Sequence, residues 1–254
     1  MVNKISAGSF DLNKWLFGGY EKDIITMVAG GPGSGKTNFS LLAACSQAKK
    51  GNKVIFIDTE GGFSVERVKQ IVGEDYKGCL DNILLLEPTN FEEQKMAFDK
   101  LLKTLKKEHV GLIVVDGMAM LYRLELGDAR DQEAEVAPPG VPSAEGKINK
   151  VNRAVAKQMR CLAEIARKQK IPVLITNQVY AQFVKDSDEN WKSGFDKEFN
   201  IVGGDLFKYW SKCIIELKRD GSKRKAVLLK HRSLEEKEMG FVIKDAGIFK
   251  KGLF

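Results

Sequence analysis

The residues with the clearest chemistry lie between positions 30 and 37. Glycines without a Cβ let successive backbone N–H groups turn inward around a phosphate, and a following helix directs its positive end at the same point. We therefore expect this segment, with Asn38 at the start of the helix, to bind the phosphates of a nucleotide. It has the spacing G-x-x-x-x-G-K-[ST] of a phosphate-binding loop and reads Gly30, Gly31, Pro32, Gly33, Ser34, Gly35, Lys36 and Thr37.

Two side chains of this loop have distinct expected roles. A lysine placed as Lys36 is reaches the β- and γ-phosphate oxygens, and the hydroxyl of Thr37 is a ligand for Mg²⁺. A glycine-rich turn between a strand and a helix is the structural alternative. The strand-like run 24–29 before the loop and the helix-like run 38–49 after it favour the phosphate loop. ATP with Mg²⁺ is thus the expected ligand.

Phosphoryl transfer also needs an acid near the metal and a group that positions the attacking water. The apolar run 112–115 ends in Asp116, which we predict to ligate Mg²⁺ at the carboxyl end of a buried strand. The run 54–57 likewise leads into Asp58 and Glu60, and we assign Glu60 as the general base. Asp58 is an alternative base. A further alternative is that both acids only cap the turn after them.

The rest of the chain predicts how these groups are positioned. Short apolar runs at 24–29, 54–57, 83–86, 112–115 and 173–176 alternate with amphipathic stretches. This alternation predicts an α/β fold with a mainly parallel sheet between two layers of helices. The last run leads to Gln178, a candidate sensor of the γ-phosphate.

Beyond residue 179 the pattern changes to that of antiparallel strands. Runs at 212–217, 223–231 and 240–244, with a turn at 220–221, predict an extension of one side of the sheet. Segments 127–146 and 181–204 are predicted to be long loops, which are usually functional or disordered. The length of 254 residues suits a single domain over 1–254.

The composition indicates the redox state of the cysteines and the solubility of the protein. The four cysteines are isolated in apolar or helical stretches, which predicts reduced, buried thiols rather than a metal site or disulfides. There is no apolar run of 18 residues and no hydrophobic leader at the start, so we expect a soluble protein of the cytoplasm.

The net charge of +7 is concentrated in two segments. In the first, 147–170, eight Lys and Arg residues stand against one acid. At 100° per residue the apolar positions 148, 151, 155, 159, 162 and 165 share one side of a helix. Solvated helix faces usually mix both signs, so the nearly acid-free stripe on the other side favours contact with a phosphate backbone. Its residues are Lys147, Lys150, Arg153, Lys157 and Arg160.

The second basic segment is the hairpin 218–232, with seven Lys and Arg residues against one acid. Lys223, Arg224, Lys230 and Arg232 are candidate contacts to DNA phosphates. Two alternatives remain open. Lys230 and Arg232 would reach the γ-phosphate of a neighbouring subunit, or the lysines only protect an exposed sheet edge from aggregation.

These motifs together resemble the RecA/RadA recombinase superfamily, in this order and at these spacings. They are the loop 30–37, the stretch 58–63, the run 112–116 and the stretch 176–179, with 5–19 similar to the start of that ATPase core. The triplet 230–232, followed by acidic residues and Gly240-Phe241, is most similar to the short archaeal RadA paralogues of the RadB group. The resemblance covers essentially the whole chain.

The resemblance implies roles for the motif residues. Thr37 and Asp116 would hold Mg²⁺, Glu60 would activate water, and Gln178 would link the nucleotide to a DNA-facing loop. Segments 127–146 and 181–204 would match the two DNA loops of the recombinases. Arg67 is a candidate for stacking on adenine, although the family usually places an arginine at the position of Ser64.

The implied function is that of an ATPase accessory to homologous recombination and DNA repair in an archaeal cell, associated with the nucleoid. It would bind single-stranded DNA through phosphates and assist a recombinase such as RadA, with slow hydrolysis. The family's helix-hairpin-helix domain and Phe-x-x-Ala polymerisation motif do not precede this core, so we expect a monomer or weak oligomer. The alternatives are a non-catalytic, nucleotide-gated interaction protein and a ring-forming ATPase of the KaiC or helicase type.

Overall fold

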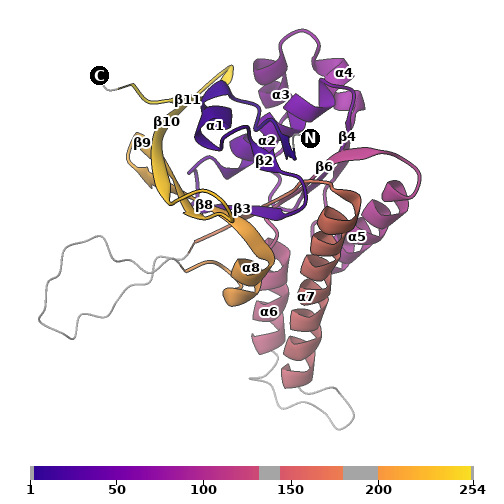
Figure 1. The fold of residues 1–254 in the computed structure, drawn as a ribbon. Helices are drawn as coiled ribbons and strands as arrows, with labels where there is room; N and C mark the ends of the chain where they lie inside the picture. Colours follow the sequence, from indigo (N-terminus) through magenta and orange to yellow (C-terminus); the bar gives the residue numbers. More distant parts are fainter. Residues whose placement is uncertain (1–2, 132–143, 180–199, 253–254) are drawn as a thin grey trace, which may run out of the picture.

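The computed structural model describes residues 3–131, 144–179 and 200–252 (Figure 1). Its strands are β1 (Lys4–Ile5), β2 (Tyr20–Glu21), β3 (Ile25–Gly30), β4 (Lys53–Asp58), β5 (Ile83–Leu86), β6 (Val110–Asp116), β7 (Val173–Asn177), β8 (Ser211–Asp220), β9 (Lys223–Lys230), β10 (Lys237–Lys244) and β11 (Gly247–Lys250). Its helices are α1 (Phe10–Trp15), α2 (Lys36–Ala48), α3 (Val65–Val72), α4 (Tyr76–Asp81), α5 (Phe91–Leu105), α6 (Met120–Asp131), α7 (Ala144–Gln169) and α8 (Asp205–Trp210).

The described strands form a nine-stranded sheet in the order β11-β10-β9-β8-β3-β7-β6-β4-β5, besides the small β1–β2 pair. From β8 to β5 neighbouring strands are parallel, and β8 to β11 continue as an antiparallel group. The predicted α/β class, its parallel runs and its antiparallel extension are therefore confirmed. β3 lies near the middle, buried along its whole length, which is typical of a parallel strand covered on both faces.

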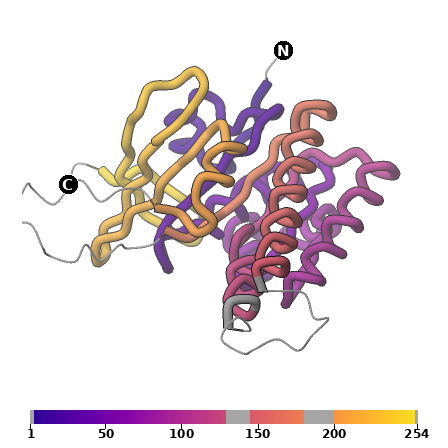
Figure 2. Tube along the Cα trace, turned by 90° about the horizontal axis from the view of Figure 1, so that it is seen from below, coloured from indigo at the N-terminus to yellow at the C-terminus, as the bar shows by residue number. Residues whose placement is uncertain are grey.

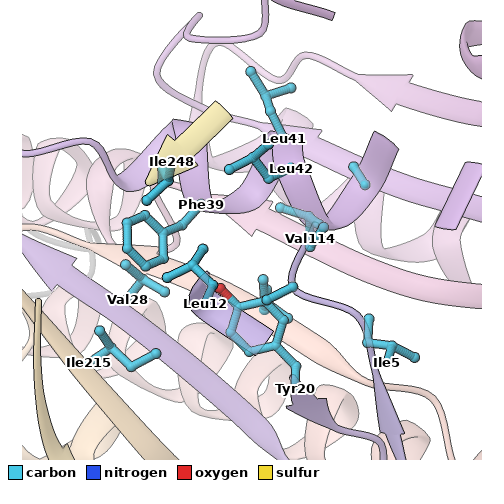
Figure 3. Close-up of a cluster of buried hydrophobic side chains, with 14 of the residues drawn as sticks. Ile5, Leu12, Tyr20, Val28, Phe39, Leu41, Leu42, Val114, Ile215 and Ile248 are labelled. Carbon is cyan, nitrogen blue, oxygen red and sulfur yellow. The ribbon is translucent and has the colours of Figure 1, made fainter. Parts of the chain in front are cut away.

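Helices cover both faces of the sheet (Figures 1 and 2). On one face α2 packs with α1, α3 and α4 in a core that includes Phe39, Leu42 and Val114 (Figure 3). On the other face α5, α6 and α7 form a second core with residues such as Ile113 and Phe207. The apolar side predicted for 148–165 is the buried side of α7, although Ile148 is only half-buried.

Several helices begin as elementary capping chemistry predicts. Ser9, Ser64 and Asn90 each accept a backbone N–H from the first turn of α1, α3 and α5. Gly35, in contrast, begins α2 in the left-handed region at φ 112°, without a side-chain cap. The first turn of α2 thus leaves its N–H groups directed at the loop in front of it, where an anion would satisfy them.

The structure alters the expectations for both long connections. Residues 127–131 and 144–146 are helical, as the ends of α6 and α7, so the first predicted loop is shorter than 127–146. Part of the second, 200–204, holds a bridge between Val179 and Ile201 and a turn. Residues 132–143 and 180–199 lie outside the described residues. None of the helices described here is long and apolar enough to cross a membrane.

Candidate nucleotide site

The predicted catalytic groups meet at one edge of the sheet. Parallel pairing of β3, β7, β6 and β4 aligns their carboxyl ends, with Ala29 opposite Asn177 and Asp58 opposite Asp116. Ligands of open α/β sheets bind outside such ends. A cavity of about 570 Å³ opens there, lined by Pro32, Gly33, Gly35, Lys36, Thr37, Asn38, Glu60, Gln178, Arg224 and Ile243.

The phosphate loop holds its lysine against the protein. The ammonium of Lys36 donates hydrogen bonds to the carbonyls of Gly30, at 3.1 Å, and Gly31, at 3.2 Å. Burial lowers the pKa of Lys36, an effect opposed by the nearby charges of Glu60 and Asp116. Phosphate oxygens are stronger acceptors than carbonyls for a buried ammonium, so a bound nucleotide would draw Lys36 away from the loop.

The structure also decides which side chains lie on the same side of the loop. A Cβ built on Gly62 would lie 3.1 Å from Thr37 Oγ1 and 3.7 Å from Asp116 Oδ2, so these two atoms face the same space. Asp116 Oδ1 accepts a 2.5 Å hydrogen bond from the Thr176 hydroxyl, whereas the buried Oδ2 lacks a partner. A carboxylate oxygen left without a partner next to a hydroxyl fits Mg²⁺, which prefers oxygen ligands.

The two candidate bases have different surroundings. Asp58 is buried, and its two carboxylate oxygens accept backbone N–H groups from Glu60 at 3.1 Å and Phe63 at 2.7 Å. Glu60 is exposed, lines the cavity and accepts a 3.2 Å hydrogen bond from Gln178 Nε2. Capping of the turn therefore belongs to Asp58, and the geometry favours Glu60 as the residue that meets a water at the γ-phosphate.

The burial of Asp116 leads to a prediction of how the free energy of unfolding depends on pH. Burial raises the pKa of Asp116 from its ordinary 3.8 to about 6. The folded state thus holds the proton more tightly than the unfolded chain, and ionisation costs stability as the pH rises from about 4 through about 6. Without Mg²⁺ or nucleotide, we expect Asp116→Asn to be about 1–3 kcal/mol more stable than the wild type at pH 8 and no more stable at pH 4. Urea unfolding at both pH values tests this; an Asn variant less stable at pH 8 would contradict it.

Arg67, the candidate for stacking on adenine, is held by neighbouring elements. Its guanidinium donates to Asn38 Oδ1 at 2.8 Å and to the carbonyls of Lys244 and Asp245 in the turn between β10 and β11. It therefore joins α3 to α2 and to this turn. Arg67 is not among the residues that line the cavity, but it donates to Asn38, which is.

The basic stripe of α7 divides into two parts. Arg153, Lys157 and Arg160 are exposed. Lys147 and Lys150 instead line a groove between α5, α6 and α7 that also contains Glu92, Glu125 and Asp128, so acids oppose this end of the stripe.

The candidate DNA contacts of the basic hairpin also lie in two different places. Lys230 and Arg232 lie toward the end of the sheet remote from the phosphate loop, because Lys230 pairs with Ile214, which pairs with Met27 of β3. Arg232 forms 2.6 Å ion pairs with Glu21 and with Asp23, and Lys230 donates to the carbonyl of Lys208.

The sequence alone did not predict two features of this region. Arg224, which the sequence grouped with the DNA contacts, lines the cavity beside the phosphate loop. Only the register of β9 on β8, together with that of β8 on β3, brings it there. The ion pair of Arg232 with Asp23 joins residues 209 positions apart in the chain, which no local pattern indicates.

Comparison with known proteins identifies the family to which this chain belongs. A family model described as Rad51 matches residues 1–251. This chain belongs to the Rad51 family. Proteins of the Rad51 family are generally ATPases that bind ATP with Mg²⁺.

Within the Rad51 family, the relatives point to its RadB group. A protein of Methanobrevibacter smithii named DNA repair and recombination protein RadB is 38% identical over 242 residues, covering 93% of this chain and 92% of the relative. Proteins of the same name from Methanococcus maripaludis (strain C7) and Methanocaldococcus jannaschii are 40% and 35% identical over 227 and 237 residues. These alignments cover 89% and 93% of this chain and 91% and 98% of the relatives. The predicted resemblance to archaeal RadB is confirmed.

Proposed function

We propose that this chain is an ATP- and DNA-binding accessory or mediator protein of homologous recombination and DNA repair in an archaeal cell, with weak Mg²⁺-dependent ATP hydrolysis. The single observation that carries the proposal is the convergence of Lys36, Thr37 and Glu60 on one cavity at the carboxyl ends of the parallel strands, with Asp116 Oδ2 facing the same space as Thr37 Oγ1. The names of the RadB relatives support the recombination setting.

The residues divide the work of phosphoryl transfer. The first N–H groups of α2 and the ammonium of Lys36 bind the β- and γ-phosphates. Thr37 and Asp116 hold the metal, which when bound neutralises charge on the phosphate oxygens. Glu60 orients a water, and the amide of Gln178 fixes the Glu60 carboxylate through their 3.2 Å hydrogen bond. The family resemblance implies that the same amide links the nucleotide to the segment that follows Val179 in the chain.

We expect hydrolysis by an isolated chain to be slow. The transition state of phosphoryl transfer needs several positive charges around the γ-phosphate. The family resemblance assigns part of that charge to a neighbouring subunit or partner, for which a recombinase such as RadA is the first candidate. A rate that rises when a partner is added would fit this reading.

DNA contact is proposed for the exposed part of the α7 stripe. Arg153 and Lys157 lie one helical turn apart and are both exposed. Like charges at this spacing destabilise a helix slightly, and a phosphate backbone along the helix would relieve their repulsion. Single-stranded DNA is the proposed ligand.

Measured binding to fluorescently labelled single-stranded DNA at several salt concentrations tests this contact. For the double variant Arg153→Ala with Lys157→Ala, we expect weaker binding and a salt slope smaller by roughly 1.4, since each phosphate contact on a single strand contributes about 0.7. The control replaces Lys106 and Lys107, exposed after the end of α5, by alanine and removes the same net charge. An equal loss in both double variants would exclude a specific α7 surface.

A further inference from the structure

Two arginines lie directly opposite each other beside the phosphate loop. Arg219 of β8 pairs with Arg224 of β9 in the antiparallel register. The pair sits at the nucleotide end of the sheet, because Leu217, two residues before Arg219, pairs with Gly30 of β3. Like charges directly opposite on antiparallel strands are destabilising. An anion bound between or beside the two side chains would remove that cost.

Arg219 is attached to the outside of the loop. Its Nη1 donates a 3.4 Å hydrogen bond to the carbonyl of Gly33, and its Nε donates to the carbonyl of Gly221 at 3.0 Å. A Cβ on Gly33 would lie 2.5 Å from Nη1, so a side chain at this position would push the guanidinium away from the loop. Arg219 thus braces the phosphate loop from the hairpin, through carbonyl groups rather than through acids.

Arg224 has a different position. It lines the cavity together with Lys36, Thr37 and Glu60, and its Nε is buried without a hydrogen-bond partner. A buried guanidinium N–H without an acceptor is costly, and in a native structure it calls for an explanation. Here the unused donor belongs to a side chain on the wall of a cavity that already presents a phosphate-binding lysine.

We propose that Arg224 binds the phosphate chain of the nucleotide, as a second cationic side chain supplied by the same subunit, while Arg219 holds the loop at Gly33. The planar guanidinium suits phosphate oxygens, to which it can donate two parallel hydrogen bonds. Arg224 is anchored in a strand paired on both sides, to Arg219 and to Phe241, so little side-chain and no backbone ordering is needed on binding. This inference rests on the proposed ATP binding.

The test measures dissociation constants for MgATP and, by competition, for magnesium tripolyphosphate, which is the phosphate chain without a nucleoside. For Arg224→Ala we expect both ligands to bind about 10-fold to 100-fold more weakly, as for loss of a hydrogen-bonded charge. Arg224→Lys keeps the charge without the fork and should bind with intermediate affinity. The matched control is Lys225→Ala, one residue later on β9, exposed and paired with Glu238, which should bind both ligands as the wild type does.

Thermal unfolding without nucleotide separates binding from folding. Removing one of two opposed like charges should leave Arg224→Ala at least as stable as the wild type. Wild-type affinity of Arg224→Ala for MgATP would overturn the inference, and so would a loss for MgATP without a loss for tripolyphosphate, which would place Arg224 on the nucleoside. Failure of the wild type itself to bind MgATP would instead refute the proposed function.

Discussion

Replacement of Glu60 by glutamine is expected to lower ATP turnover by about 100-fold to 10,000-fold, the usual contribution of a general base. The cavity should still bind MgATP, because the phosphate contacts of Lys36 and the metal ligands Thr37 and Asp116 are unchanged. The glutamine amide occupies nearly the same volume and keeps an oxygen for the hydrogen bond from Gln178. Single-turnover hydrolysis and equilibrium nucleotide binding, measured on the same preparations, give the two quantities.

The control for Glu60→Gln is Glu66→Gln. Glu66 is an exposed acid of α3 that pairs with Lys69 at 2.6 Å, away from the cavity. Its replacement should leave turnover unchanged. If Glu60→Gln hydrolyses ATP as fast as the wild type, Glu60 is not the base. If the wild type binds but does not hydrolyse ATP and still binds its partner, the chain is a nucleotide-gated interaction protein.

The second large effect concerns the helix that follows the phosphate loop. Phe39 of α2 is fully buried (Figure 3). Its ring meets that of Phe241 of β10 edge to face, with ring centroids 5.5 Å apart. We expect Phe39→Ala to lower the free energy of unfolding by about 3–5 kcal/mol, through lost burial and the cavity left behind. Urea unfolding measures this change from the shift in midpoint, provided that the dependence of the free energy on urea concentration is the same in both proteins.

The matched control is Phe10→Ala. Phe10 opens α1 and is 80% exposed, so its loss should change stability by only about 0.5 kcal/mol in either direction. Equal effects of the two substitutions would show that α2 is not fixed by its contact with β10. The position of the phosphate loop would then need another explanation, since α2 starts directly after it.

Features of the fold and the site that depend on residues close together in the chain can be predicted from the sequence, whereas those that depend on residues far apart cannot. The parallel strands follow from apolar runs whose burial on both faces is a local pattern, and the phosphate loop follows from glycine conformation. The sequence alone does not distinguish Glu60 from Asp58 as the general base. Only the folded turn shows that Asp58 accepts two backbone N–H groups.

Other parts lie beyond any local pattern. The place of Arg224 depends on how β9 aligns with β8 and β8 with β3, and one residue of slippage would turn it to the other face of the sheet. Strand β11 was not predicted, because four residues after a turn give little periodicity. Residues 127–131 and 144–146 belong to α6 and α7, two helices that pack against each other, and the loop-like composition of 127–146 gives no sign of that contact.

The measurement that tests the central claim most directly is ATP turnover by the purified chain at low salt, with and without single-stranded DNA, using Lys36→Ala as the blank. The account predicts slow, Mg²⁺-dependent turnover that disappears in Lys36→Ala, while DNA still binds without strong stimulation of the rate. Fast turnover by the monomer without DNA would contradict it. So would strong stimulation by DNA alone, which indicates a self-assembling recombinase.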